Sequence, residues 1–183
     1  YKHVEVEIDP SEYPVVTVED AREAEIGEKV RVTGIVARIT YANGRVPSGV
    51  ILVDGNDSIY VYSSDVAGQV AIGNKIEVAG VKAYWILETE KNNADKFGYK
   101  GCNQIESAIL VSNDKGNHNF VDADFEELTV KELLDTPVTE DVTTQIYKVN
   151  ALVKKVPGSG FTNYYFFDID GETGAYTYTQ CNG

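Results

Sequence analysis

Hydrophobic and polar residues alternate with a period of two along much of this 183-residue chain, which is typical of β-strands that bury one face. The alternation in residues 3–8 predicts a first strand, which the Asp9-Pro10 pair ends. Further strands are expected between clusters of Gly, Asn and Asp, at residues 29–41, 49–54, 58–63, 75–85 and 104–112. Many short strands at close spacing indicate an all-β fold.

A short helix is expected just before the strand at 29–41. Thr17 can cap its N-terminus, because Asp20 stands at the third position of a capping box, and Gly27 marks its end. The strand that follows is long, and its buried side is expected to hold Val30, Val32, Ile35 and Ile39. Gly34 interrupts this strand where a small barrel needs a sharp bend.

Residues 53–59 place Asp-Gly-Asn-Asp between two apolar runs, which is a strong signal for a hairpin. After this turn Tyr60 and Tyr62 alternate with apolar residues, so both tyrosines are expected to face outward. Residues 86–100 form a polar insertion between two strands and are expected to be an exposed loop.

The second part of the chain repeats the order of these patterns. Segments 128–133, 148–156, 165–171 and 175–178 match 16–21, 32–39, 49–55 and 59–62, at separations of 112 to 116 residues. The repeat predicts two tandem five-stranded β-barrels with short helices, of which the second is incomplete at the C-terminus. The expected division is an N-terminal strand and linker at 1–15, a barrel at 16–112, a linker at 113–127 and a partial barrel at 128–183. The strand at 3–8 is a candidate to complete the second barrel.

A family resemblance rests on three runs of the first repeat. These are Gly-Glu-Lys-Val-Arg-Val-Thr-Gly-Ile-Val at 27–36, Val-Ile-Leu-Val-Asp-Gly with Ile-Tyr-Val-Tyr at 50–62, and Ile-Gly-Asn-Lys-Ile-Glu-Val-Ala-Gly at 72–80. They resemble the bacterial extracytoplasmic repeats of the oligonucleotide/oligosaccharide-binding (OB) fold, which accompany secreted nucleases and other cell-surface proteins. The resemblance implies an OB-fold barrel with a helix and an association with binding, and it carries over no catalytic residue.

The ligand face of an OB barrel lies on strands two and three with their flanking loops. On this chain the face offers Arg38, Tyr41, Arg45, Tyr60 and Tyr62. Aromatic rings beside guanidinium groups can stack on bases or on sugars. The alternative is that the tyrosines only shield their neighbours on a half-exposed sheet, where tyrosine is a good strand former.

Trp85 is the single tryptophan of the chain and follows Tyr84 at the end of an expected strand. It either extends the ligand face or belongs to the core of the barrel. Asp168, Asp170 and Glu172 resemble the start of a calcium-binding loop, but no glutamate follows at the spacing of an EF-hand, and Asp-Gly also marks a hairpin turn. A turn is therefore predicted there, with no metal or other cofactor.

The histidines and cysteines give no catalytic pattern. His3 and His118 stand outside any triad or metal-binding motif, so no enzymatic activity is predicted. Cys102 and Cys181 lack metal-binding spacing and are expected to be two unpaired apolar residues or, alternatively, a disulfide between the two halves.

The formal net charge of −13 opposes the approach of a polyanion at long range, which weakens a nucleic-acid interpretation. The longest apolar runs are of strand length, far below the roughly 20 residues of a membrane-spanning helix, so no membrane insertion is expected. An acidic surface rich in Tyr, Asn and Thr is typical of an extracytoplasmic protein, which predicts a secreted or cell-surface location.

Two kinds of function fit these observations. The first is a non-catalytic structural or interaction module of an exported bacterial protein, whose partners are other domains of a longer parent chain or a separate protein. The second is a domain that binds carbohydrate or single-stranded nucleic acid through the exposed Tyr/Arg face. An open patch of tyrosines and arginines would favour binding, whereas a covered one would favour a spacer.

Overall fold

The computed structural model describes residues 9–43, 45–55, 57–86, 88–91, 101–118, 126–136, 147–157, 162–171 and 174–177. They form two compact units, the first built from described residues between 9 and 118 and the second from those between 126 and 177. The expected strand at 3–8 and Cys181 lie outside the described residues, as does most of the expected loop at 86–100. The described part of that loop includes a short helix, α3 (Glu88–Lys91).

The first unit begins with the 3-10 turn η1 (Pro10–Glu12) and the helix α1 (Val18–Glu23). The side chain of Thr17 accepts a hydrogen bond from the backbone N–H of Asp20, as the capping pattern predicts. Before the helix, Val15 forms a parallel bridge with Arg31 on the first strand. These contacts fix where the helix meets the sheet.

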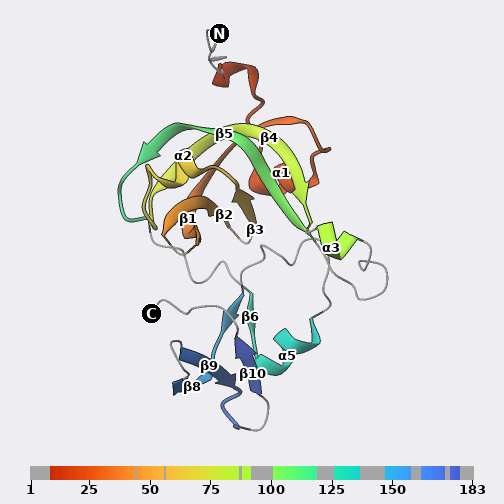
Figure 1. Cartoon of the computed structure of the whole chain (residues 1–183), viewed down its shortest axis with the longest axis vertical. Helices are drawn as coiled ribbons and strands as arrows, with labels where there is room; N and C mark the ends of the chain where they lie inside the picture. The colour runs from red at the N-terminus through yellow and green to blue at the C-terminus, as the bar shows by residue number, and fades with distance from the viewer. Residues whose placement is uncertain are drawn as a thin grey trace. The chain divides into compact units, whose positions relative to one another are not determined.

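Five strands form one closed barrel in the order β1-β2-β3-β5-β4 (Figure 1). Their bounds are β1 (Lys29–Ala42), β2 (Val46–Asp54), β3 (Asp57–Val61), β4 (Lys75–Trp85) and β5 (Cys102–Asp114). All neighbouring pairs are antiparallel except β3 and β5, which pair in parallel through Tyr60 opposite Gln104 and Val61 opposite Ile105. A five-stranded Greek-key barrel of this kind is an OB fold, which confirms the expected fold class of the first unit.

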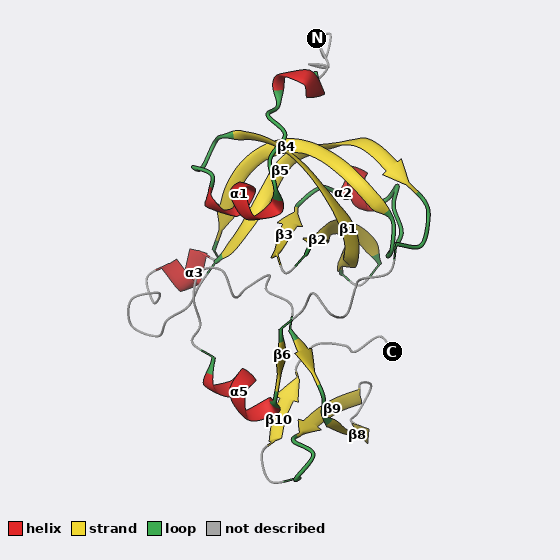
Figure 2. Cartoon of the chain, turned by 180° about the vertical axis from the view of Figure 1, so that it is seen from behind, coloured by secondary structure: helices red, strands yellow, loops and turns green. Residues whose placement is uncertain are grey.

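Both short helices of the barrel unit contribute side chains to its core. The helix α2 (Ser64–Ala67) connects β3 to β4, and Figure 2 shows α1 and α2 against the curved sheet from behind. Val18 and Ala21 of α1 and Val66 and Ala67 of α2 are almost completely buried. The strands supply the rest of the core, namely Val30, Val32, Val36, Val50, Leu52, Ile59, Val61, Ile76, Val78, Ile105 and Ala108.

A β-bulge in β1 changes which side chains face the core. Val36 pairs with Leu52 and Arg38 pairs with Ile51, so Ala37 is an extra residue on β1. Before the bulge the even-numbered residues are buried, and Ile35 is only half-buried, in contrast to the expectation that it belongs to the core side. After the bulge Ile39 packs against the core, as expected, and Arg38 turns to the outer surface.

Gly34 marks a close approach of two strands rather than an unusual backbone conformation. A Cβ atom at this position would lie 3.0 Å from the carbonyl oxygen of Val53 and 3.1 Å from Cβ of Leu52. Gly34 is an interior position of β1, and its lack of a side chain lets β1 and β2 approach closely in the barrel wall.

Two buried cations anchor α1 to the barrel, which the sequence analysis did not predict. Nη1 of Arg22 donates to the carbonyl oxygen of Ser58 at 2.6 Å. Nζ of Lys82 donates to the carbonyl oxygen of Arg22 and, at 2.8 Å, to Oδ1 of Asn103. Buried charges are tolerated when hydrogen bonds satisfy them, so this network serves the structure of the barrel.

The second unit contains two small sheets and one helix. Its elements are β6 (Glu127–Leu128), α5 (Val130–Asp135), β7 (Lys148–Val149), β8 (Leu152–Pro157), β9 (Thr162–Phe167) and β10 (Gly174–Thr177). β6 and β7 form a parallel pair, and β10, β9 and β8 form an antiparallel sheet in that order. Thr129 and Glu132 form the full capping box that the repeat predicts at the start of α5.

The second unit shares one further feature with the first. The segment before α5 pairs in parallel with the next strand, Glu127 opposite Lys148, just as Val15 pairs with Arg31 before β1. The described residues of this unit nevertheless form an open sheet, so the expected second barrel is not confirmed. Among the described helices of the whole chain, none is long and apolar enough to cross a membrane.

Candidate ligand-binding site

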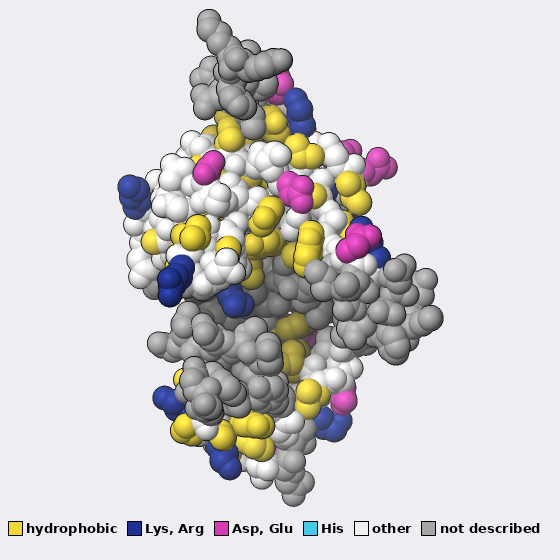
Figure 3. Space-filling view, viewed as in Figure 1, with side chains coloured by type: hydrophobic (Ala, Val, Ile, Leu, Met, Phe, Trp, Pro, Cys, Tyr) yellow, Lys and Arg dark blue, Asp and Glu magenta, His cyan; other side chains and the backbone are white. Residues whose placement is uncertain are grey.

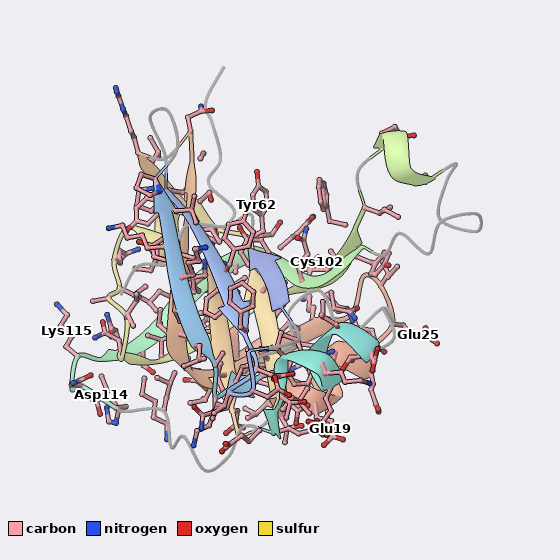
Figure 4. The ribbon with its side chains drawn as sticks, turned by 90° about the horizontal axis from the view of Figure 1, so that it is seen from below. Glu19, Glu25, Tyr62, Cys102, Asp114 and Lys115 are labelled. Atoms are coloured by element: carbon pink, nitrogen blue, oxygen red, sulfur yellow. The ribbon has the colours of Figure 1, made fainter. Side chains whose placement is uncertain are left out.

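An open cavity of about 510 Å³ lies on the outer face of the barrel. It is lined by Arg38, Thr40, Ile51, Tyr60, Tyr62, Trp85, Cys102 and Gln104. We call this site the aromatic cavity. Figure 4 shows Tyr62 and Cys102 on one side of the barrel, away from Asp114 and Lys115 at the other end of β5.

The centre of the cavity is a row of side chains that crosses four strands. Arg38 pairs with Ile51, Ile51 with Tyr60, and Tyr60 with Gln104. Residues paired in this way lie side by side on the same face of a sheet. Arg38 reaches the row only because the bulge at Ala37 turns it outward, so the local irregularity of β1 assembles the site.

Tyr60 is held in place by contacts with β2 and, across it, with β1. Its Oη lies 2.8 Å from Oγ1 of Thr40 on β1, and the same Oγ1 donates to the carbonyl oxygen of Gly49. A Cβ atom at Gly49 would collide with Oη of Tyr60, so the ring lies across this glycine. The absence of a side chain at Gly49 therefore gives Tyr60 a fixed, half-buried position.

Tyr62 and Trp85 form the exposed rim of the cavity. Their exposed fractions are 55% and 53%, which is large for aromatic side chains in a folded domain. The rings of Tyr60 and Tyr62 lie 6.3 Å apart between centroids and are tilted by 40°. Trp85 stands at the end of β4 opposite Cys102 on β5. These rings can receive a flat ligand without any change in the core.

The charge at the cavity differs from the charge of the whole chain. Arg38 is positive, and none of the eight described residues that line the cavity is acidic. A second groove, of about 540 Å³, is lined by Glu12, Asp20, Glu23 and Glu28 with one lysine. Figure 3 likewise shows apolar side chains on the barrel with acidic and basic groups scattered around them. The net charge of −13 is therefore not concentrated in the aromatic cavity.

No protein-family model and no curated protein matches this chain. Solved structures match in part. The S. pombe Stn1–Ten1 complex has a TM-score of 0.34 and 16% identity over 57% of this chain and 76% of that chain. The S. pombe telomere capping protein Ten1 has the same TM-score and identity over 56% and 80%. A putative aspartyl-tRNA synthetase from Leishmania major has a TM-score of 0.37 and 13% identity over 66% and 24%. At these values the similarities assign no function to the chain.

The structure brings four of the six predicted site residues together. Arg38, Tyr60, Tyr62 and Trp85 all line the aromatic cavity, and Trp85 is exposed rather than part of the core. Tyr41 and Arg45 do not line it. Tyr41 follows Thr40 on β1, and successive residues of a strand face opposite sides, so its 52% exposed ring lies outside the cavity. Arg45 lies in the turn that leads into β2.

Sequence analysis missed four lining residues, Thr40, Ile51, Cys102 and Gln104. Thr40 and Ile51 could have been found from strand pairing, had the bulge been known. Cys102 and Gln104 come from β5, which joins this face by its parallel pairing with β3 and its antiparallel pairing with β4. A long-range parallel pairing leaves no local pattern in the sequence, so these two residues gave no signal.

The other sequence candidates do not form a site. Asp168 is buried, and its carboxylate accepts hydrogen bonds from the N–H groups of Val130 and Lys131 at 2.6 and 3.1 Å. Residues 169–171 form a turn, as predicted. His118 pairs with Asp114 at 3.0 Å at the end of β5. Among the described residues, no group of His, Cys, Asp and Glu is arranged to hold a metal ion. His3, Glu172 and Cys181 lie outside the described residues.

Proposed function

We propose that the first unit is a non-catalytic binding domain that holds a short stretch of single-stranded nucleic acid in the aromatic cavity. The observation that carries this proposal is the convergence of Tyr60, Tyr62, Trp85 and Arg38 on one open cavity of the OB barrel. Ligands of OB domains occupy this face.

Stacking gives the physical reason for this choice. A base has two flat faces, and stacking on an aromatic side chain contributes about 1–3 kcal/mol per base. Tyr62 and Trp85 present more than half of their surface to solvent, and Arg38 stands on the same face. A guanidinium group can stack on a base or bind a phosphate. The site therefore has the groups that a short single-stranded segment requires.

The acidity of the chain limits the affinity but does not exclude this ligand. Long-range repulsion slows the approach of a polyanion, and Arg38 is the one cation among the described residues that line the cavity. Binding then depends mainly on stacking, and its dependence on salt is weak. About one phosphate contact predicts a slope near −0.7 in a plot of log K against log salt concentration.

A carbohydrate is the second candidate. The same single guanidinium favours it, because sugars stack on aromatic rings without needing several cations. A neutral glycan would also escape the repulsion that a net charge of −13 imposes. The two ligands differ in salt dependence, which would be absent for a neutral glycan.

The wider setting of the domain is proposed on the sequence resemblance and on one feature of the second unit. We propose that it belongs to an exported bacterial protein, secreted or at the cell surface, in which other domains or a protein partner lie beside the barrel. The feature that supports a partner is the exposed apolar surface of the second unit. More than half of each side chain is exposed at Leu134, Leu152, Val153 and Ile169.

Fluorescence of Trp85 tests the binding proposal, because it is the single tryptophan and lies in the cavity. Titration with single-stranded oligonucleotides is expected to give a saturable change. Tyr62→Ala should weaken binding about tenfold, the value of one stacking contact. Tyr41→Ala is the matched control, because Tyr41 is equally exposed but lies outside the cavity, and it should leave binding unchanged.

The outcomes separate the candidates. Saturable binding of oligonucleotides that Tyr62→Ala weakens and Tyr41→Ala does not would support the proposal. A response to a panel of neutral glycans, without one to oligonucleotides, would replace it with the carbohydrate alternative. If neither oligonucleotides nor neutral glycans change the fluorescence, the structural or protein-docking role would be favoured.

A further inference from the structure

Gln104 is the most buried of the residues that line the aromatic cavity. Its exposed fraction is 3%, although it lines the same cavity as Tyr62 and Trp85, whose exposed fractions exceed 50%. It lies on β5 between Tyr60 of β3 and Ala83 of β4, at the end of the row that begins with Arg38. A ligand that enters between the exposed rings would therefore have the Gln104 side chain in the most buried part of the cavity wall.

The orientation of this amide is fixed by one neighbour. Nε2 of Gln104 donates to Oε1 of Glu106 at 2.5 Å, and the two side chains lie on the same face of β5. A carboxylate accepts hydrogen bonds and does not donate them, so the amide must turn its NH₂ group towards Glu106. Among the described residues, no donor is bonded to Oε1 of Gln104. The polar atom left for a ligand is therefore an acceptor.

We infer that Gln104 selects bases that carry an exocyclic amino group, with Glu106 as the positioning residue that keeps the amide in this orientation. The inference rests on the proposed function and names the class of base that the cavity prefers. Cytosine presents an N4 amino donor where thymine presents the O4 acceptor. Oε1 of Gln104 can accept a hydrogen bond from the N4 amino group of cytosine. Against thymine, Oε1 would face O4, which is also an acceptor.

A glutamine without a fixed neighbour would not discriminate in this way. Its amide can rotate by half a turn and offer either the NH₂ group or the oxygen, so it can satisfy cytosine and thymine alike. Glu106 removes this freedom. The preference is thus a property of the pair of side chains rather than of Gln104 alone.

The experiment compares binding of oligo-dC and oligo-dT of about ten nucleotides, within the range of an OB site, by Trp85 fluorescence. The wild-type protein is expected to bind oligo-dC about fivefold more tightly, the value of one net hydrogen bond. Gln104→Leu should reduce the ratio to below twofold by weakening oligo-dC binding. Glu106→Gln should also reduce the ratio, but by strengthening oligo-dT binding, because the freed amide can then donate.

Each result has one meaning. The absence of saturable binding of both oligonucleotides would overturn the proposed function and this inference with it. Equal affinities in the wild-type protein would overturn the inference and leave the proposed function in place. A preference that survives Gln104→Leu or Glu106→Gln would assign base selection to other residues and would also overturn the inference. Circular dichroism confirms that each variant retains the barrel before its ratio is compared.

Discussion

The phenol oxygen of Tyr60 lies 2.8 Å from Oγ1 of Thr40, which joins β3 to β1 across the intervening strand β2. The ring can span β2 because Gly49 has no side chain at the crossing point. The central aromatic group of the cavity is therefore positioned by the sheet itself. A ligand that stacks on this ring would meet a side chain that is already ordered, which lowers the entropy that binding costs.

The Tyr60–Thr40 hydrogen bond gives a first prediction. Tyr60→Phe and Thr40→Val each remove it, and each is expected to lower the free energy of unfolding by about 1 kcal/mol. The double variant should lose clearly less than the sum of the two single losses, because both remove the same bond. Urea denaturation measures the three values. Strict additivity would show that the two side chains are not coupled.

Gly49 should tolerate no side chain. In Gly49→Ala the new Cβ would collide with Oη of Tyr60 and would lie 2.5 Å from the carbonyl oxygen of Val61, a backbone atom that cannot move freely. We expect a loss of about 1–3 kcal/mol in stability together with weaker ligand binding. Gly68→Ala is the control, since its nearest heavy atom is at 3.2 Å outside the cavity. It should change stability little and binding not at all.

Asp168 should be important for the stability of the second unit. Its buried carboxylate binds two N–H groups at the start of α5, and Asp168→Ala would leave Val130 and Lys131 without this acceptor. The expected loss is about 1–2 kcal/mol, as for other helix caps. Asp135→Asn breaks only the exposed pair with Lys131 and should cost less than about 1 kcal/mol. Equal effects of the two variants in thermal denaturation would contradict the prediction.

The same helix start is expected to depend on pH. Hydrogen bonds from the backbone N–H and then the hydroxyl of Thr129 hold the pKa of Glu132 below its ordinary value of 4.5. The ionised carboxylate therefore stabilises the folded state above pH 4.5, and this contribution is lost as the pH falls through the lower pKa of the folded state. Titration by NMR measures this pKa. Thr129→Val should raise it only in part, because the backbone donor remains.

Much of the barrel could be predicted from alternation and turn residues alone. The strand expected at 29–41 is observed at Lys29–Ala42, and the outward position of Tyr60 and Tyr62 follows from simple alternation. Ile35 was wrongly placed on the core side because the change of phase in β1 lies after it, at Ala37, and a bulge depends on the pairing partner and leaves no periodic signal. Gln104 could not be identified for a similar reason. Gln104 follows the polar Asn103 at the start of β5, and its burial depends on neighbours from β3 and β4 that lie far away in the sequence.

The single extra residue at Ala37 divides β1 into two segments in which the side chains alternate with opposite phase. Before Ala37 the even-numbered side chains face the core, and after it the even-numbered side chains of Arg38 and Thr40 line the aromatic cavity. If β1 kept its length but paired regularly with β2, without the bulge, the charge of Arg38 would be directed into the hydrocarbon core and Ile39 into the solvent. The bulge therefore serves the core and the aromatic cavity together, because it keeps the side chains of both in phase.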